Sequence, residues 1–348
     1  MSSSPVPVNR QIVLASRPTG GLTSSHFAIV DEAIAEPAPG QLLVRNILLS
    51  IDPANRAWMQ AATYRDRLEA GQVIDAFTLG EVIGQRNTNV AIGAVVECLH
   101  GGWQEYAVVD AEEVRVIDVV APLQHHMGCL GITGLTAYFG LDRIAKVKCG
   151  ETLVVSAAAG ATGHIVGQLA KLAGARVVGI TGSDNKNRFL CEKLGFDAAV
   201  NHHSADLKAE LDAACPSGID VYFDNVGGPL LETILRHMNV AGRVACCGVV
   251  SQYDTDSPAP GPRGVPGLLI TKRLRMEGFL LTDYHDEWHA ASSVLADHVT
   301  AGRITPVEAP VDGLQHAPQA LLDLLAGRNL GKVMVRVADD PKPTGGQT

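Results

Sequence analysis

Three glycines, Gly160, Gly163 and Gly167, have the spacing of a turn that binds phosphate groups. They lie in the stretch from Glu151 to Gly182, after a short apolar run from Leu153 to Ala159 that contains neither Gly nor Pro. A run of this length predicts one buried strand of a parallel sheet, because it is too short for a helix. The glycines therefore follow a strand directly, which is the context that a dinucleotide-binding turn requires.

The residues after the glycines predict a helix and a second strand. Ile165, Leu169 and Leu172 recur at helical spacing and predict a face packed on a sheet, and the segment from Arg176 to Thr181 predicts the next strand. Strand, glycine turn, helix and strand make a right-handed βαβ unit, whose turn directs backbone N–H groups and a helix dipole at an anion. We therefore predict a dinucleotide site. The alternative is a glycine turn that only lets the helix and the strand pack closely.

The end of the second predicted strand indicates which dinucleotide is bound. An NAD site has an acidic side chain here for the ribose 2′-hydroxyl, whereas an NADP site has a cation for the 2′-phosphate. The chain has Thr181 and Gly182 at this place, with Asp184 slightly later and then Lys186 and Arg188. This order favours NADPH, with Lys186 as the phosphate contact. Alternatively, Lys186 and Arg188 are ordinary exposed charges on the following helix.

The composition excludes several classes of partner. The 348 residues are 46% hydrophobic and 19% charged, which is typical of a globular protein of two domains. A formal net charge of −9 without a basic stripe argues against nucleic acid and anionic membranes as partners. The start MSSSPVPVNRQ lacks the apolar core of a secretory signal, and no apolar run is long enough to span a membrane. We expect a cytoplasmic protein whose partners are small molecules or a second copy of itself.

The cysteines and histidines do not form a recognisable metal motif. There is no C-x-x-C pair, and the seven cysteines are scattered: Cys98, Cys129, Cys149, Cys191, Cys215, Cys246 and Cys247. His125 and His126 are adjacent, and His285 and His289 have a spacing that can hold a metal on a helix, but no third ligand is near in sequence. We expect no disulfide and no metal, and interpret both histidine pairs as structural or exposed.

The first part of the chain is rich in short strands. Gly, Pro and Asn separate strands predicted at residues 11–14, 41–50, 80–84, 94–98 and 103–109. This pattern indicates a barrel-like β domain. The connector from Asp52 to Arg67 predicts a loop or short helix with unusual aromatic and cationic content.

Strands and helices alternate after residue 130. Together with the βαβ unit, strands predicted at residues 219–224, 243–249 and 276–281 and a helix at 229–238 indicate a doubly wound parallel sheet of six strands. The segment from Ser257 to Gly267 is rich in Pro and Gly, and we expect an irregular excursion there, of the kind that forms a flap. Helices are predicted at residues 283–301 and 315–326. A final strand after GRNLGK is expected to return to the N-terminal β domain.

Several motifs of the chain resemble one known family. The chain is similar to the zinc-free branch of the medium-chain dehydrogenase/reductase superfamily, in the group of prostaglandin reductase, leukotriene hydroxydehydrogenase and alkenal double-bond reductase. The matching motifs are GLTAYFGL (134–141), SAAAGATG (156–163), VVGITGSDNK (177–186), KLGFDAAVN (193–201), YFDNVGG (222–228), CGVVSQY (247–253), RMEGF (275–279) and GRNLGK (327–332).

The resemblance implies an α/β fold with two domains. A GroES-like β-barrel domain is expected over residues 1–130, completed by residues 308–338, and a Rossmann domain with a doubly wound parallel sheet over residues 131–307. Residues 339–348 are interpreted as a disordered tail from their composition. NADPH is expected between the domains, and the implied reaction is reduction of the carbon–carbon double bond of α,β-unsaturated ketones and aldehydes. A homodimer is expected on the same basis.

Transferred motif by motif, the resemblance also implies the cofactor contacts. The pyrophosphate is expected to lie on Gly160, Ala161, Thr162 and Gly163, and the 2′-phosphate on Lys186 and His202. The remaining parts of the cofactor are expected to contact Thr136, Asn225, Cys247, Gly248, Val249, Val250, Ser251, Gln252, Tyr253, Phe279, Leu280, Leu281 and Asn329.

The chain departs from the family at a few positions. His202 replaces the family's Tyr, which either weakens the phosphate site slightly or makes it dependent on pH, because an imidazole gains charge when protonated. Thr133 replaces a Pro. Ala54 replaces a Tyr thought to line the substrate cavity, while Tyr64 retains a second cavity aromatic. The identity of the substrate therefore does not transfer.

Tyr253 is the candidate proton donor of the reaction. Reduction of an enone needs a hydride at the β-carbon, a hydrogen-bond donor for the oxygen and a proton for the α-carbon. A phenol with a pKa near 10 stays protonated at neutral pH and can donate. Tyr253 acts alone or beside the ribose hydroxyl of the cofactor; the alternative is a side chain that only packs on the nicotinamide.

Two other functions remain open from the sequence. A quinone oxidoreductase would share the fold and the cofactor, and differ only in the compounds that it reduces. A non-catalytic NADPH-binding protein would bind the nucleotide without oxidising it in the presence of any enone.

Overall fold

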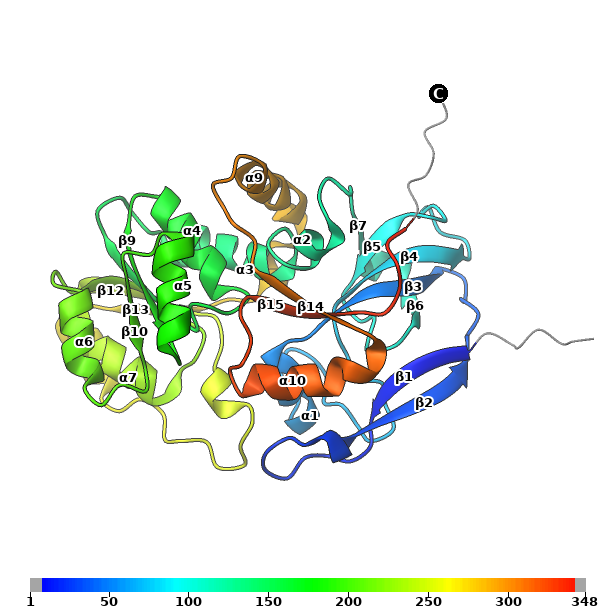
Figure 1. Ribbon diagram of the computed structural model, residues 1–348, viewed down its shortest axis with the longest axis horizontal. Helices are drawn as coiled ribbons and strands as arrows, with labels where there is room; N and C mark the ends of the chain where they lie inside the picture. The colour runs from blue at the N-terminus through cyan, green and yellow to red at the C-terminus, as the bar shows by residue number, and fades with distance from the viewer. Residues whose placement is uncertain (1–7, 342–348) are drawn as a thin grey trace, which may run out of the picture. The chain divides into compact units, whose positions relative to one another are not determined.

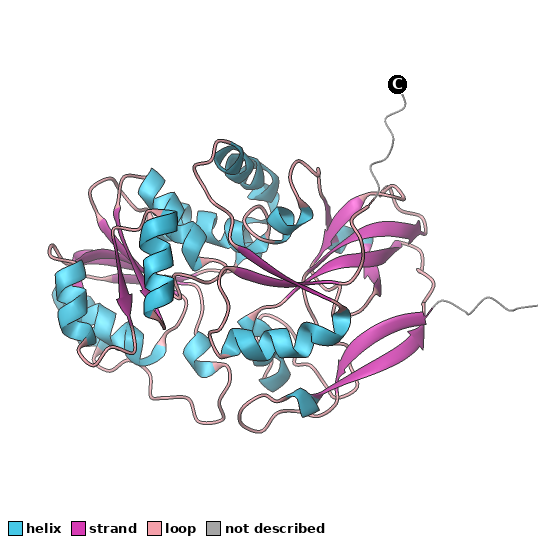
Figure 2. Ribbon diagram, viewed as in Figure 1, coloured by secondary structure: helices cyan, strands magenta, loops and turns pink. Residues whose placement is uncertain are grey.

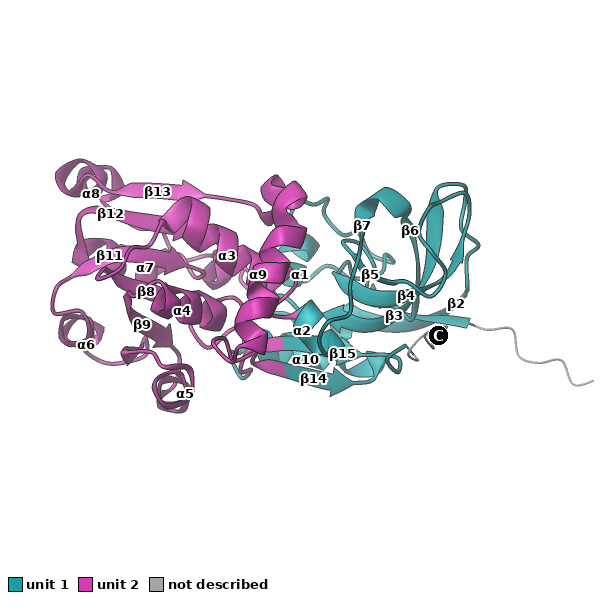
Figure 3. Ribbon diagram, turned by 90° about the horizontal axis from the view of Figure 1, so that it is seen from above, with its two compact units in different colours: residues 1–127, 309–328, 333–348 teal, residues 128–308, 329–332 magenta. Residues whose placement is uncertain are grey.

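The computed structural model describes residues 8–341, which separate into two units (Figures 1 and 3). Unit 1 comprises residues 1–127, 309–328 and 333–348, and unit 2 comprises residues 128–308 and 329–332. Residues 1–7 and most of the expected tail, residues 342–348, lie outside the described residues. Each unit contains a sheet of its own, drawn in magenta in Figure 2.

Unit 1 is built on a sheet in which strands β15, β3, β4, β5, β6 and β7 pair in antiparallel fashion. Its seven strands have the order β14-β15-β3-β4-β5-β7, with β6 paired to β3, and β1 and β2 form a separate pair. The strands and helices are β1 (Val8–Leu14), β2 (Phe27–Ala33), β3 (Gln41–Ser50), α1 (Pro53–Gln60), β4 (Thr78–Gln85), β5 (Val95–Cys98), β6 (Tyr106–Asp110), β7 (Val114–Val116), α2 (Leu123–Met127), β14 (Glu308–Asp312), α10 (Ala317–Leu325) and β15 (Lys332–Arg336).

The last strand, β15, pairs with β3, as the sequence predicts: Met334 lies opposite Ser50 and Val335 opposite Leu49. The connector after β3 forms helix α1, where Asp52 stands before the first turn and its backbone N–H is bound by Asn55 Oδ1 at 2.8 Å. Pro53 fits the first turn because that position needs no N–H donor.

Unit 2 is built on six parallel strands in the order β10-β9-β8-β11-β12-β13, the doubly wound arrangement that the sequence predicts. The elements are α3 (Ile132–Phe139), a π-helical turn (Gly140–Ala145), β8 (Thr152–Ser156), α4 (Gly163–Leu172), β9 (Arg176–Thr181), α5 (Asp184–Leu194), β10 (Ala198–Asn201), α6 (Leu207–Ala214), β11 (Ile219–Asp224), α7 (Gly228–His237), β12 (Met238–Cys246), α8 (Val265–Lys272), β13 (Arg275–Gly278) and α9 (Trp288–Thr300).

Apolar side chains hold helices against this sheet. On one face, Leu211 of α6 and Leu235 of α7 pack with Val178, Tyr222 and Val244 of the strands, all buried. On α4 the buried face differs from the predicted one: Ile165 is buried, but Leu172 is 42% exposed, because the helix ends there. None of the helices in residues 8–341 has the length and apolar character needed to cross a membrane.

Two predicted segments are wrong in part. The segment from Ser257 to Gly267 is not irregular throughout, because α8 begins at Val265 with Pro266 in its first turn, where proline is tolerated. The predicted helix at residues 283–301 is divided: a 3-10 helix from Leu281 to Glu287 precedes α9, with a non-helical Tyr284 inside it.

Candidate functional site

Each of the six parallel strands of unit 2 is followed by a residue that the sequence assigns to the cofactor. In parallel α/β sheets, ligands bind at the carboxyl ends of the strands. Strands β8, β9, β10, β11, β12 and β13 end at Ser156, Thr181, Asn201, Asp224, Cys246 and Gly278, and the assigned residues after them are Gly160, Lys186, His202, Asn225, Cys247 and Phe279. The assigned residues are spread over 120 residues of sequence. The fold of unit 2 brings them together at one edge of its sheet.

The glycine turn after β8 presents free backbone donors. The strand ends at Ser156, earlier than predicted, because Ala157 adopts a left-handed conformation with φ +48° and starts the turn. The Gly160 N–H then donates to the Ala157 oxygen at 2.9 Å. The Ala161 N–H faces the Gly331 carbonyl oxygen, because Gly160 and Gly331 form a parallel β-bridge. The next two N–H groups, of Thr162 and Gly163, make no hydrogen bond within residues 8–341. Two such donors at the start of α4 suit an anion.

The two glycines of this turn have different roles. A Cβ on Gly163 would lie 2.4 Å from the Ala157 oxygen and 2.8 Å from the Ala158 Cα, so this glycine lets the helix approach the end of β8. A Cβ on Gly160 would meet only the Ala157 oxygen, at 3.1 Å. Gly160 therefore borders open space, where a pyrophosphate can approach the main chain.

His164 fixes the glycine turn and was missed in the sequence. Its Nδ1 lies 2.7 Å from the Gly160 carbonyl oxygen, which only accepts, so Nδ1 carries the proton. Burial lowers the pKa of His164 to about 4, which keeps the imidazole neutral. Its position directly after Gly163, where the helix starts, is the signal that could have identified it.

The segment from Asn329 to Lys332 reaches the same turn from the far end of the chain. Gly331 N–H donates to the Ala159 oxygen at 2.8 Å, and Asn329 Nδ2 donates to the Gly331 oxygen at 3.0 Å. Gly331 has φ +70°, and a Cβ there would lie 2.0 Å from the Val307 oxygen, so only glycine fits. Asn329 is thereby held beside the glycine turn, which agrees with its predicted place at the cofactor.

A buried carboxylate, Asp224, organises the loop that carries Asn225. Its Oδ1 accepts hydrogen bonds from Tyr222 Oη at 2.9 Å, from Val226 N at 3.0 Å and from Gly227 N at 2.9 Å. Burial raises the pKa of Asp224, while these donors oppose the rise. Sequence reasoning missed this role, although Asp224 lies in the YFDNVGG motif.

Asn225 and the start of the CGVVSQY segment are tied together at this loop. Asn225 Nδ2 donates to the Ser156 oxygen at 2.7 Å, which links the ends of β11 and β8. The N–H groups of Cys247 and Gly248 donate to the backbone carbonyl oxygen of Asp224 at 2.8 and 3.1 Å. Asn225 and this segment therefore lie side by side in the structure.

Tyr253 closes a short 3-10 turn at Val250–Gln252. Val249 N–H donates to the Tyr253 hydroxyl oxygen at 3.4 Å, so the hydroxyl accepts locally and its own proton remains available. Burial raises the pKa of Tyr253. The phenol is therefore protonated at neutral pH, as a hydrogen-bond donor must be. Ser251, in the same turn, donates to the Val226 oxygen at 2.6 Å and holds the turn on the Asn225 loop.

Lys186 lies in the first turn of α5, just beyond the end of β9. Ser183 caps this helix by accepting from the Lys186 N–H at 3.4 Å. Burial lowers the pKa of Lys186. The competing acid, Asp184, accepts a hydrogen bond from Asn201 Nδ2 at 2.9 Å and is engaged within the protein. The structure thus offers a cation at this strand end, and His202 follows the neighbouring strand.

The remaining predicted contacts in unit 2 are apolar or already engaged. Thr136 Oγ1 donates to the Ile132 oxygen of its own helix at 2.7 Å. Phe279 meets the ring of Phe223 edge-on at 6.3 Å, and Leu280 is partly exposed before the 3-10 helix that begins at Leu281.

The two residues assigned to the substrate cavity in addition to Tyr253 belong to unit 1. Ala54 is half-buried on α1, and Tyr64 is 55% exposed after it. The Tyr64 ring meets Trp58 edge-on at 6.1 Å, and the Arg65 guanidinium lies over Trp58 at 4.3 Å. An aromatic and cationic cluster therefore follows α1.

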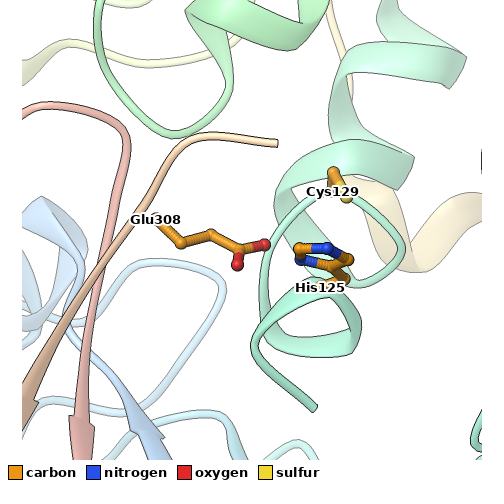
Figure 4. A group of neighbouring side chains, drawn as sticks. All are labelled: His125, Cys129 and Glu308. Atoms are coloured by element: carbon orange, nitrogen blue, oxygen red, sulfur yellow. The ribbon is translucent and has the colours of Figure 1, made fainter. Parts of the chain in front are cut away.

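A pair of metal-ligating groups in unit 2 was not expected from the sequence. Cys129 Sγ and a carboxylate oxygen of Glu308 lie within 4.8 Å of each other; Figure 4 draws them together with His125 of unit 1. Burial, followed by the nearby Glu308, raises the pKa of the Cys129 thiol to about 12. A structural zinc site needs four ligands, and this pair supplies two.

The family models and known proteins agree with this architecture. Residues 10–117 match the N-terminal domain of an oxidoreductase, and residues 161–297 match a family described as zinc-binding dehydrogenase. The chain is 39% identical to an NADPH-dependent curcumin reductase of Escherichia coli (strain K12) over 95% of this chain and 98% of that protein. It is 37% identical to an NADP(+)-dependent 2-alkenal reductase of Nicotiana tabacum over 95% of this chain and 98% of that protein.

A solved structure extends the likeness to three dimensions. CurA of Vibrio vulnificus, in complex with NADPH, has a TM-score of 0.89 and 37% identity, and the match covers 95% of this chain and 100% of that chain. Fold and family models together define a two-domain oxidoreductase. Within that class, the chain belongs to the zinc-free branch of the medium-chain dehydrogenase/reductase superfamily, in the group of the prostaglandin and alkenal double-bond reductases. The predicted family and fold class are confirmed.

Proposed function

We propose that this protein is an NADPH-dependent reductase of the carbon–carbon double bond of α,β-unsaturated ketones and aldehydes. The observation that carries the proposal is the pair of free N–H donors at Thr162 and Gly163, at the carboxyl end of a doubly wound sheet. The relatives named above as curcumin and 2-alkenal reductases support the reaction.

The residues of unit 2 fit NADPH. Gly160 leaves the main chain open to a pyrophosphate, and the free N–H donors of Thr162 and Gly163 are suited to bind it. Lys186 supplies a cation for the 2′-phosphate, while Asp184 is engaged by Asn201 and does not compete for the ribose. Asn225, Asn329 and the Cys247–Tyr253 segment are the further residues that would hold the cofactor. When bound, NADPH supplies the hydride that is added to the β-carbon.

The chain's own contribution to the chemistry is a hydrogen-bond donor. Negative charge develops on the carbonyl oxygen of an enone as the β-carbon is reduced. The Tyr253 phenol, kept protonated by burial, is suited to donate to that oxygen. Ser251 and Asp224 position it, because they hold the turn and the loop on which it depends.

The proposal is tested by following NADPH oxidation with separate panels of enals, enones and quinones. We expect saturable turnover of the enals and enones with NADPH. Turnover confined to quinones would replace the proposal with a quinone oxidoreductase, and binding of NADPH without any turnover would indicate a non-catalytic protein.

Selectivity for NADPH is tested at Lys186. Removal of its charge by Lys186→Ala should cost a charge-assisted contact of roughly 1.5–3 kcal/mol, which is about one to two decades in the KM for NADPH. The KM for NADH should change little, because NADH lacks the 2′-phosphate. An equal change for both nucleotides would remove the assignment of Lys186 to the phosphate.

We also propose a cytoplasmic homodimer formed along the edge of the unit 2 sheet. Strand β13 ends the strand order, so its outer edge is unpaired within residues 8–341, and Ile270 of the adjacent α8 is 75% exposed. The free state of all seven cysteines agrees with a reducing compartment. Ile270→Glu should shift the molecular mass in light scattering from dimer to monomer, whereas Ile29→Glu on β2 should leave it unchanged.

A further inference from the structure

Two adjacent imidazoles, His202 and His203, directly follow strand β10 and lie beside the end of strand β9. His202 N–H donates to the Thr181 oxygen at 2.9 Å, which extends the pairing of β10 with β9 by one residue. The two rings have centroids 3.9 Å apart. A Cβ on Gly182 would lie 3.1 Å from His202 Nε2 and 3.5 Å from His203 Nε2. Both Nε2 atoms therefore converge on one point beside Gly182.

These ring nitrogens are available to a ligand. Both side chains are exposed, and within residues 8–341 neither ring makes a hydrogen bond; the His203 backbone N–H donates to Asn201 Oδ1 at 3.1 Å. Gly182 stands where an acid would select NAD, at the end of the second strand of the dinucleotide fold. Two ring nitrogens without a partner thus lie at the place where a ribose 2′-phosphate is recognised, and each becomes a donor when its ring is protonated.

Helices α5 and α6 contribute charged groups near the pair. Helix α5 contributes the cation Lys186 and the acid Asp184, which is held by Asn201. Helix α6 is capped by Asp206, whose carboxylate accepts the Ala209 N–H at 3.1 Å. Burial, followed by the neighbouring His203, lowers the pKa of His202. Without ligand, His202 is therefore neutral near pH 7.

We propose that His202 and His203 form one proton-linked specificity element, which takes up a proton when the 2′-phosphate of NADPH binds. The inference rests on the proposed function and adds a regulation of the same site by pH. The proton comes from solvent and is bound by an imidazole nitrogen, and no covalent bond of the nucleotide changes. Two rings at 3.9 Å hold a single proton, because a second cation beside the first is disfavoured.

This mechanism predicts that the affinity depends on pH for NADPH and not for NADH. One linked proton lowers NADPH affinity by up to about tenfold for each unit that the pH rises, above the pKa of the free pair. NADH has no phosphate to favour the protonated imidazole, so its affinity should be independent of pH. Selectivity for NADPH should therefore be greatest in mildly acidic solution.

Isothermal titration calorimetry tests the proposal directly. NADPH and NADH are titrated into the full-length protein at pH 6.5, 7.25 and 8.0, in two buffers of different ionisation enthalpy, which reveals the number of protons bound. We expect proton uptake with NADPH and none with NADH. His202→Gln combined with His203→Gln should abolish the uptake and weaken NADPH about tenfold at pH 6.5, whereas either single variant should retain part of it. His289→Gln, an exposed imidazole on α9, is the control and should behave like the wild type.

The outcomes separate the inference from the proposed function. NADPH binding with the same proton balance in the wild type and the double variant would overturn the role of the histidines, while the reductase would stand. Failure of the wild type to bind NADPH at any pH would instead overturn the proposed function.

Discussion

Tyr253 is the residue on which the chemistry of the chain depends most directly. Tyr253→Phe keeps the ring and removes the hydroxyl, whose local contact is a long hydrogen bond of 3.4 Å from Val249 N–H. We expect kcat for an enone to fall by about 10²–10⁴, the usual range for the loss of a general acid. The dissociation constant of NADPH, measured by fluorescence quenching, should be unchanged. An unchanged kcat would leave Tyr253 as a packing residue only.

Some residues of the candidate site were assigned from the sequence and others were not. The glycines and Lys186 were assigned from their spacing in the βαβ unit, and Asn225 from the resemblance of its motif to the family. His164 and Asp224 act through their hydrogen bonds to backbone groups, which no spacing reveals. The sequence shows that His203 is adjacent to His202. It does not show that both rings converge on Gly182, because this depends on how the turn after β10 folds.

Helix α4 illustrates how tightly an element is fitted to the sheet. A Cβ on Gly167 would lie 1.9 Å from Cζ of the buried Phe196 ring. Gly167→Ala should therefore destabilise the protein by about 1–3 kcal/mol, because overpacking outweighs the gain in helix propensity of about 1 kcal/mol. Urea denaturation measures the change.

Gly267 on α8 provides a matched control for this substitution. A Cβ there would meet nothing within 4 Å, so Gly267→Ala should keep the propensity gain and stabilise the protein by up to about 1 kcal/mol. If both variants changed the stability in the same direction, the packing argument for Gly167 would fail.

At the scale of elements, apolar runs predicted the sheet better than they predicted the helices. Strands β9 and β11 have the predicted bounds, since each is a continuous buried run. Strand β8 ends early because Ala157 takes a left-handed conformation, which the sequence AAAG does not indicate. Helix α8 was missed because a segment rich in Pro and Gly looks irregular, although proline is compatible with a first turn.

The whole molecule should lose stability in mild acid, because each unit buries a neutral histidine. Burial lowers the pKa of both His126 in unit 1 and His164 in unit 2 to about 4. The unfolded chain binds a proton near pH 6.5, whereas the folded chain does not until about pH 4, so stability falls as the pH drops between these values. From pH 7 to pH 5, each histidine should cost about 2 kcal/mol of unfolding free energy.

Urea denaturation at pH 5, 6 and 7 checks this expectation. His164→Gln, which retains an N–H donor for Gly160, should show a shallower dependence on pH than the wild type. His289→Gln, at an exposed position, should follow the wild type. A wild-type stability that did not change from pH 7 to pH 5 would contradict the assignment of two neutral buried histidines.

The pairing of β15 with β3 has a consequence for synthesis on the ribosome. Strand β3 is complete after residue 50, but its partner β15 and the neighbouring β14 are translated only from residue 308 onward. The nascent sheet of unit 1 therefore waits, with one strand edge open, while most of unit 2 is made. Such an edge is a site for unwanted pairing between chains. A translation pause before residue 332 would prolong that exposure, and chaperones that shield strand edges would be needed longest at this stage.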